Sequence, residues 1–287
     1  MTEAWSHWPA PAKLNLFLHI VGRRNDGYHL LQTVFQLLDW GDTIRLRPRQ
    51  DGIIARVAGL AQVAPEDDLA LRAAHALRAA TGCAVGADIA VDKRIPNGGG
   101  LGGGSSDAAT VLVALNEIWD THLDEDALAA IGLCLGADVP LFVRGRTAWA
   151  EGVGERLTPI DLPSRHFAIV DPGVAVSTAA LFQAPELTRN SPPMTIADFL
   201  AGMDTANAFA RTARARFPQV AAALDWLGQY GDARLSGSGG CVFVAVESEQ
   251  QTETIVRACP PQFVAYRARG VNRSLLHDAL ESFRLRK

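Results

Sequence analysis

The segment best suited to chemistry is a glycine-rich run at residues 96–107, PNGGGLGGGSSD, in which six of the seven residues from Gly98 to Gly104 are glycine. A glycine-rich backbone can turn successive N–H groups toward one anion, and a helix that begins behind it adds the positive end of its dipole. The run stands between a strand pattern at 87–95 and apolar residues at helical spacing over 108–119. This order of strand, glycine loop and helix predicts a site for a triphosphate.

A flexible linker would also be rich in glycine, but linkers seldom join a strand to an amphipathic helix. Ser105, Ser106 and Asp107 stand at the start of that helix, where we expect them to supply its cap. A Walker loop is excluded because no GK[ST] follows the glycines. A GxGxxG can be read from Gly98 to Gly103, but it follows from the density of glycine and is only a weak dinucleotide signal.

Lysine is scarce in this chain, since only Lys13, Lys93 and Lys287 among the 27 basic residues are lysine. A protein that uses arginine for general positive charge is expected to keep lysine for work that needs a compact ammonium group. In the strand pattern at 13–21, KLNLFLHIV, alternation predicts one face that carries Lys13, Asn15, Phe17 and His19. The strand is therefore expected to present an ammonium group and an amide together.

The length and composition of the chain exclude several classes of protein. The 287 residues suggest about two domains, and the net charge of −4 gives no field for a polyanion, so we expect no binding to nucleic acid. The most apolar stretch, 127–137, is too short to span a membrane, and the N-terminal MTEAWSHWPAPAK has no secretory pattern, so a cytoplasmic protein is expected. The four cysteines and seven histidines are spaced like neither a disulfide framework nor a transition-metal site.

The order of strand and helix patterns predicts an α+β chain in two parts. Strand patterns dominate the N-terminal region, and helices are expected at 66–80 and 126–135. The proline-containing segment 158–166 is the expected domain boundary, which gives domains 1–160 and 161–287. Beyond it we expect a strand at 166–170, helices within 195–229, and a second glycine turn, LSGSGG at 235–240, that leads into the strand CVFVAV.

The glycine run PNGGGLGGGSSDAA resembles the phosphate loop of the GHMP kinase superfamily. Three further segments extend the resemblance in the same order: PAKLNLFLHIVGRRNDGYHLLQTVF (11–35), LGADVPLFV (135–143) and SGSGGCVFV (236–244). The resemblance implies a two-domain fold with an N-terminal ATP-binding domain like ribosomal protein S5 and a ferredoxin-like C-terminal α/β domain. It also implies transfer of a phosphoryl group from ATP, with Mg²⁺, to an alcohol, and it leaves the magnesium ligands unassigned.

By the same resemblance, Lys13 and Asp138 match the catalytic pair, with Asp138 receiving or orienting the hydroxyl proton and Lys13 stabilising charge. From the residues alone, Asp138 could equally be a turn residue before Pro140, and Lys13 a surface lysine. The residues expected to hold the nucleotide are Lys93, Pro96, Asn97, Gly98, Gly99, Gly100, Leu101, Gly102, Gly103, Gly104, Ser105 and Ser106. Lys93 could instead end an exposed strand.

The DGYH at 26–29 points to one branch of the superfamily, whose acceptor alcohol carries a cytidine diphosphate and is phosphorylated at its 2-hydroxyl in non-mevalonate isoprenoid synthesis. The matching substrate positions are Asn15, Tyr28, His29, Val153 and Phe182. Tyr28 and Phe182 would hold the cytosine between their rings while His29 reads its edge. Without the resemblance, the two aromatic residues are expected in a core or at a rim.

The chain departs from the family at Asn207–Ala210, where both acids of an Asn-Asp-x-Glu pattern are replaced by alanine, at Ala208 and Ala210. The turn Gly237–Gly239 is either a tight entry to a strand or a phosphate contact. Two other functions stay open from the pattern: another GHMP activity of the homoserine or mevalonate type, and a regulatory module that binds a nucleotide without turnover. The expected partners are small molecules, with neither nucleic acid nor membrane among them, and nothing in the pattern indicates an oligomeric state.

Overall fold

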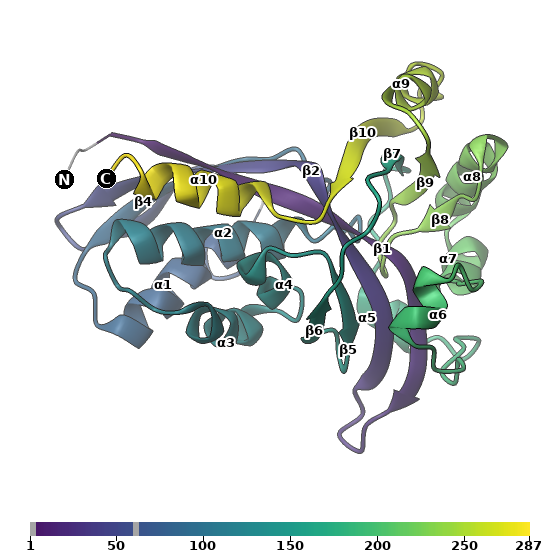
Figure 1. Cartoon of the computed structure of the whole chain (residues 1–287), viewed down its shortest axis with the longest axis horizontal. Coiled ribbons are helices and arrows are strands. Elements are labelled where there is room, and N and C mark those ends of the chain that lie inside the picture. Colours follow the sequence, from purple (N-terminus) through teal and green to yellow (C-terminus); the bar gives the residue numbers. More distant parts are fainter. Residues whose placement is uncertain (1–3, 60–62) are drawn as a thin grey trace.

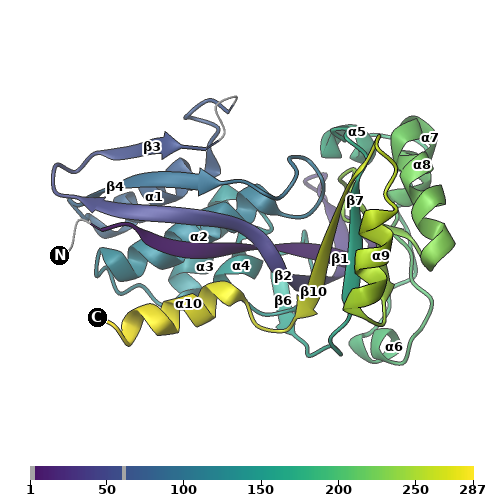
Figure 2. The same ribbon diagram turned by 90° about the horizontal axis from the view of Figure 1, so that it is seen from above.

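Two long antiparallel strands, β1 (Ser6–Arg23) and β2 (His29–Arg49), form the centre of the fold in the computed structural model, which describes residues 4–59 and 63–287. The first three residues of the N-terminal segment discussed above therefore lie outside the description. The β2 strand also pairs with strands from both halves of the chain, so the sheet is continuous across the expected domain boundary (Figure 2).

The sheet has the order β3-β4-β2-β10-β7-β9-β8, with β1 paired to β2 and β5 paired to both β2 and β6. The remaining strands are β3 (Ile54–Ala58), β4 (Gly86–Asp92), β5 (Ala148–Glu151), β6 (Arg156–Pro159), β7 (His166–Asp171), β8 (Arg234–Leu235), β9 (Val242–Val246) and β10 (Val264–Val271). The expected strands at 87–95 and 166–170 correspond to β4 and β7.

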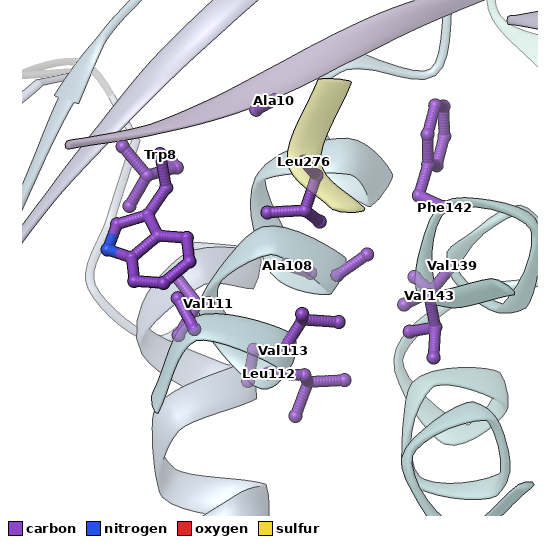
Figure 3. Packing of buried hydrophobic residues seen from close by; sticks show 14 of the residues in the cluster. Trp8, Ala10, Ala108, Val111, Leu112, Val113, Val139, Phe142, Val143 and Leu276 are labelled. Atoms are coloured by element: carbon purple, nitrogen blue, oxygen red, sulfur yellow. The ribbon is translucent and has the colours of Figure 1, made fainter. Parts of the chain in front are cut away.

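Helices cover one side of the long strand pair in the N-terminal half (Figure 1). They are α1 (Leu69–Thr81), α2 (Gly103–Ile118), α3 (Glu125–Leu135) and α4 (Val139–Arg144). The helix α10 (Leu275–Arg284) returns from the C-terminal end of the chain, and its Leu276 packs with Trp8, Val111 and Phe142 in one core (Figure 3). The boundary near residue 160 stays a prediction, and α10 lies on its N-terminal side in space.

The C-terminal half packs its strands between two apolar layers. In β7, Phe167 and Ile169 face a cluster that contains Leu14, whereas Ala168 and Val170 face the helices. This alternation has the period of a strand with both faces covered. The helices are α5 (Thr178–Phe182), α6 (Ile196–Leu200), α7 (Ala210–Arg216), α8 (Pro218–Leu227) and α9 (Glu249–Arg257), with a 3₁₀ turn at Gly228–Tyr230. Among the described residues, none of the helices combines the length and apolarity that a membrane crossing requires.

Helix ends show where local sequence rules held and where they failed. Gly82 ends α1 in the left-handed region, at φ 69°, as its position after the apolar pattern predicts. The prediction that Ser105, Ser106 or Asp107 caps α2 is wrong, because Gly102, at φ 76°, holds the cap position and makes no side-chain cap bond. Helix α2 begins at Gly103, so the three polar residues lie inside its first turns.

The two glycine turns pack backbone against backbone. A Cβ on Gly239 would lie 2.0 Å from the nitrogen of Gly100, and a Cβ on Gly100 would lie 2.1 Å from the carbonyl oxygen of Ser236. Ser236 Oγ donates to the Gly100 carbonyl at 3.1 Å, and the Cys241 N–H donates to the Gly99 carbonyl at 3.1 Å. The second turn therefore supports the first, and glycine is required at both because no side chain fits between them.

This contact predicts that Gly239→Ala destabilises the protein. Steric overpacking in a filled site typically lowers the free energy of unfolding by about 1–3 kcal/mol, and here the neighbouring atoms are backbone and cannot rotate away. Urea denaturation should show this loss. Gly228→Ala is the matched control, since Gly228 has φ −60° and no atom within 4 Å of its Cβ position, so it should be neutral or slightly stabilising. Equal midpoints for the two variants would contradict the assignment.

Candidate active site

One large cleft, of about 1170 Å³, collects most of the residues singled out from the sequence. Its walls come from β1, β2, the glycine loop, the start of α4, helix α5 and the second glycine turn. The lining residues that matter below are Lys13, Asn15, Leu18, Tyr28, His29, Thr33, Phe35, Gly100, Gly102, Ser105, Asp138, Val153, Phe182, Arg189, Phe209, Gly237 and Ser238. Segments that are more than 200 residues apart in sequence thus meet around one space.

The ammonium group of Lys13 is the most enclosed charge of the cleft. Lys13 Nζ donates to Asn15 Oδ1 at 2.6 Å and lies 3.4 Å from Asp138 Oδ2. The Lys13 side chain is 4% exposed, whereas the Asp138 side chain is 32% exposed. The ammonium also lies 5.1 Å from the centre of the Phe35 ring. A buried ammonium of this kind needs such partners, because burial without them strongly disfavours the charged form.

Irregular pairing of β1 aims these side chains into the cleft. The register against β2 shifts between Pro11 and Lys13 and again between Asn15 and Leu18. The Lys13 N–H therefore donates to the glycine-loop carbonyl of Leu101 at 3.0 Å, and Leu18 lines the cleft in place of Phe17. The predicted common face holds for Lys13 and Asn15 but is wrong for Phe17, which packs in a separate core, and for His19, whose ring packs on Phe17 outside the lining of the cleft. The reason is a bulge that reverses the alternation.

Asp138 stands at the N-cap position of α4, yet its carboxylate makes no capping hydrogen bond there. Its oxygens stay available for Lys13 and for the open cleft. The structure thus brings Lys13 and Asp138 together as the catalytic prediction requires; their chemical role stays a prediction.

The glycine loop meets the cleft through only part of its length. Gly98, Gly100 and Gly102 have φ values of 70°, 78° and 76°, so left-handed residues alternate along the loop. Such alternation curls backbone N–H groups into a concave anion site. Gly100, Gly102 and Ser105 line the cleft. The other nucleotide positions named from the sequence lie within or beside the loop, and Leu101 anchors it in the core.

Lys93 lies behind the loop with its ammonium already paired. It donates to Asp42 and, at 2.8 Å, to Asp107 Oδ2. Burial lowers the pKa of Lys93, but the two carboxylates outweigh it and hold the pKa above its usual value. Burial, with the nearby Asp42 charge, raises the pKa of Asp107 to about 7 against the opposing effect of Lys93. Lys93 thus ties β2 and α2 together under the loop, and a direct contact with the nucleotide stays a prediction.

Aromatic residues gather at the other end of the cleft. The rings of His29 and Phe182 are stacked, with centroids 4.8 Å apart and planes at 18°. Phe209 holds Phe182 from the side, with centroids also 4.8 Å apart and planes at 90°. Tyr28 is 65% exposed at the rim. The structure therefore brings the three ring-bearing residues among the predicted substrate positions to one mouth of the cleft, with His29 rather than Tyr28 against Phe182.

The imidazole of His29 is held in its neutral form. Burial and the nearby Arg189 and Arg23 charges lower the pKa of His29 below its ordinary 6.5. Its Nε2 is buried and makes no hydrogen bond within the described part of the chain. Arg189 donates to the carbonyls of Phe182, at 2.8 Å, and Ala184, at 2.7 Å, which also fixes the end of α5. A neutral ring with an unpaired nitrogen is suited to reading a polar edge of a ligand.

Three further sequence-derived positions have defined surroundings. Val153 lines the cleft, but its N–H donates to Glu155 at 2.6 Å, so this N–H is already paired within the protein. Asn207 Nδ2 donates to the Leu235 and Gly237 carbonyls at 2.9 and 2.8 Å, which ties the second glycine turn to its neighbours. Ala208, where the family has an acid, packs against the C-terminal core.

Sequence reasoning passed over four residues of the cleft or its support: Thr33, Phe35, Arg189 and Asp42. Thr33 and Phe35 lie inside the quoted segment 11–35, where a threonine and a phenylalanine of a strand give no chemical signal. Asp42 resembles any polar residue at a strand turn, and only the three-dimensional pairing with Lys93 distinguishes it.

Comparison with known proteins agrees with this geometry. The model of the GHMP kinases N terminal domain matches residues 68–146, and that of the GHMP kinases C terminal matches residues 195–265. A 4-diphosphocytidyl-2-C-methyl-D-erythritol kinase of Halorhodospira halophila is 59% identical over 283 residues, which cover 98% of each chain. A protein of the same name from Xanthomonas campestris pv. campestris is 56% identical, over 98% of this chain and 96% of its own.

Solved structures give the same assignment. A 4-(cytidine 5'-diphospho)-2C-methyl-D-erythritol kinase superposes with a TM-score of 0.81 at 33% identity, over 92% of this chain and 99% of its own. The mevalonate kinase of Methanococcus jannaschii, at 16% identity and a TM-score of 0.67, shares the fold. The two-domain α+β fold expected from the sequence is therefore confirmed. The chain belongs to the GHMP kinases, within the family of 4-diphosphocytidyl-2-C-methyl-D-erythritol kinases.

Proposed function

We propose that this protein transfers the γ-phosphoryl group of ATP to the 2-hydroxyl of 4-diphosphocytidyl-2-C-methyl-D-erythritol, a step of the non-mevalonate isoprenoid pathway. One observation carries the proposal: a single cleft has the Lys13–Asp138 pair beside the glycine loop at one end and the His29–Phe182 stack at the other. The first end suits phosphoryl transfer and the second suits a nucleobase. The names of the relatives support this choice of acceptor.

At the phosphate end, catalysis needs position and charge stabilisation more than covalent chemistry. The curled backbone of Gly98–Gly102 offers N–H groups to the phosphates, and the N-terminus of α2 adds its dipole. The Lys13 ammonium lies close enough to Asp138 to share an acceptor hydroxyl with it. Asp138 takes or orients the hydroxyl proton, while Lys13 stabilises the negative charge that develops on the transferred group.

The family also uses Mg²⁺, which neutralises phosphate charge when bound. The described ranges contain no cluster of three or more His, Cys, Asp or Glu side chains for a metal ion. Mg²⁺ usually needs few protein ligands beside phosphates. Ser105 lines the cleft, so its hydroxyl group at the start of α2 fits an ion that arrives with ATP, whereas Ser106 is fully buried and lies outside the lining. We infer that Ser105 would hold the ion together with phosphate oxygens.

At the aromatic end, Phe182 is held from the side by Phe209 and is stacked on His29, and we infer that a base takes part in this stack when it binds. Tyr28 stands exposed at the rim and can close over the opposite face of a base. The neutral His29 has a nitrogen for the edge of the cytosine. An acceptor of the mevalonate or homoserine type would leave this end unused. A regulatory module without turnover would have no need of the paired Lys13 and Asp138.

The catalytic pair predicts that Asp138→Asn lowers kcat by about 10²–10⁴-fold with little change in the KM of either substrate. An amide keeps the shape but cannot receive the proton. Steady-state kinetics with coupled detection of ADP measures this. The matched control is Asp225→Asn, an exposed aspartate on α8 paired with Arg214, which should leave kcat unchanged. Lys13→Arg should also lower kcat, because the larger, planar guanidinium group does not fit the buried space that the Lys13 ammonium occupies. Near wild-type turnover of Asp138→Asn would remove its assigned role.

The aromatic end predicts how acceptors are discriminated. Stacking of a base is worth about 1–3 kcal/mol per contact, so bare methylerythritol phosphate should be a much poorer acceptor than its cytidine diphosphate form. Phe182→Leu should reduce that discrimination about tenfold or more, measured as the ratio of the two kcat/KM values, without altering the KM for ATP. Phe217→Leu, a half-buried phenylalanine outside the cleft, is the control. Comparable kcat/KM values for the two acceptors in the wild type would contradict the proposed choice of substrate.

The neutral state of His29 predicts a pH dependence. Because burial and the nearby Arg189 and Arg23 charges lower its pKa, the imidazole becomes protonated at a lower pH than an ordinary histidine does, and the KM for the cytidine substrate should rise as the pH falls. Removing a nearby positive charge by Arg189→Gln raises the pKa of His29, so that rise should begin at a higher pH. Measuring KM between about pH 5 and 8 for both proteins tests the sign. A rise in KM that begins at the same pH, or at a lower pH, in Arg189→Gln than in the wild type contradicts this account of His29.

A further inference from the structure

The hydroxyl group of Thr33 connects the catalytic strand β1 to its neighbour β2 beneath the site. Thr33 is 1% exposed. Its Oγ1 donates to the Phe17 carbonyl and accepts from Asn15 Nδ2 at 2.9 Å. Asn15 in turn accepts the Lys13 ammonium on its Oδ1, at 2.6 Å. A chain of three hydrogen bonds therefore runs from a backbone carbonyl to the ammonium that faces Asp138.

The irregular pairing of β1 provides the starting point of this chain. Residues 16 and 17 fall in the register shift between Asn15, opposite Phe35, and Leu18, opposite Thr33. The Phe17 carbonyl thus lies at a bulge in the ladder, and the Thr33 hydroxyl occupies it. A β-bulge leaves a backbone group without its partner in the ladder, and such bulges are frequent next to active sites.

The direction of the chain follows from counting protons. A carbonyl oxygen can only accept, so the single proton of the Thr33 hydroxyl goes to Phe17. Toward Asn15 the hydroxyl can therefore only accept, and Asn15 must turn its NH₂ group to Thr33. The amide oxygen of Asn15 then faces Lys13, whose ammonium can only donate. The opposite orientation of the amide would set two donors against each other.

We propose that Thr33 is a positioning residue for phosphoryl transfer, whose hydroxyl fixes the orientation of the Asn15 amide and so holds the Lys13 ammonium in register with Asp138. The inference rests on the proposed kinase function for its effect on rate, but the hydrogen-bond chain itself does not depend on the identity of the acceptor. The side chain of Thr33 does not need to touch the reacting atoms, because its hydroxyl acts only through Asn15.

Thr33→Val tests the proposal, since valine keeps the shape and the β-branch but has no acceptor for Asn15. The expected result is a fall in kcat of about tenfold, the size expected for one lost hydrogen bond between neutral groups, with the KM for ATP unchanged. Thr33→Ser keeps the hydroxyl and should restore most of the rate. Thr212→Val is the matched control: Thr212 is 1% exposed, and its hydroxyl has no partner within the described residues, so the same substitution there should leave kcat unchanged.

A double-mutant cycle separates positioning from a general structural effect. If Thr33 acts through Asn15, then Thr33→Val should cost little further rate in an Asn15→Ala background. Additive losses, or a Thr33→Ser variant as slow as Thr33→Val, would overturn the proposal. The same cycle on the free energy of unfolding gives a coupling between Thr33 and Asn15 even if the wild type fails to phosphorylate the proposed acceptor. The rate cycle depends on the proposed function, whereas the unfolding cycle depends only on the hydrogen bond between Thr33 and Asn15. Together they distinguish a failure of this inference from a failure of the proposed function.

Discussion

The structure of the site depends on one buried positive charge, the ammonium of Lys13. A charge with this little exposure is tolerated only where fixed partners replace water. Asn15 and Asp138 supply those partners, one from the same strand and one from the start of α4. The bulges of β1, the backbone bond to Leu101 and the uncapped start of α4 all serve to bring these groups within reach. Moving any one of these elements would leave the ammonium partly unpaired.

The same requirement explains why the two glycine turns are packed so tightly. The first turn lines the cleft at Gly100 and Gly102, so side chains cannot support it on that side. The second turn supports it from behind through backbone contacts, and Asn207 fixes the second turn in place. The turn Gly237–Gly239 braces the loop, and Gly237 and Ser238 also line the cleft, so a phosphate contact of this turn stays a prediction. The loss of the acids at Ala208 and Ala210 leaves this role of Asn207 intact.

Local patterns were sufficient where the physics is local. The ends of α1 and α3 follow from terminal glycines, and the strand–loop–helix order around Gly98–Gly104 follows from composition and period, whereas α1 begins at Leu69, three residues after its expected start, because Asp68 caps it. Local patterns failed where a distant segment decides. Alternation along β1 could not reveal the bulge at 16–17, because β2 determines the register, and the start of α2 was misplaced because a left-handed Gly102 replaces a side-chain cap. The pairing of Asp42 with Lys93 is likewise invisible without the sheet.

The scarcity of lysine was informative for a physical reason that the structure makes clear. Lys13 and Lys93 both have ammonium groups enclosed between acceptors, while Lys287 lies on the surface beside Glu117 and Asp120, so two of the three lysines have the enclosed setting that a specialised ammonium needs. Lys93 shows why arginine would not serve. A Cβ on Gly103 would already lie 3.2 Å from Lys93 Nζ, which leaves no room for a planar fork between the loop and the two carboxylates. The compact ammonium therefore lets the start of α2 approach β2 closely, and that approach sets the position of the glycine loop over the cleft.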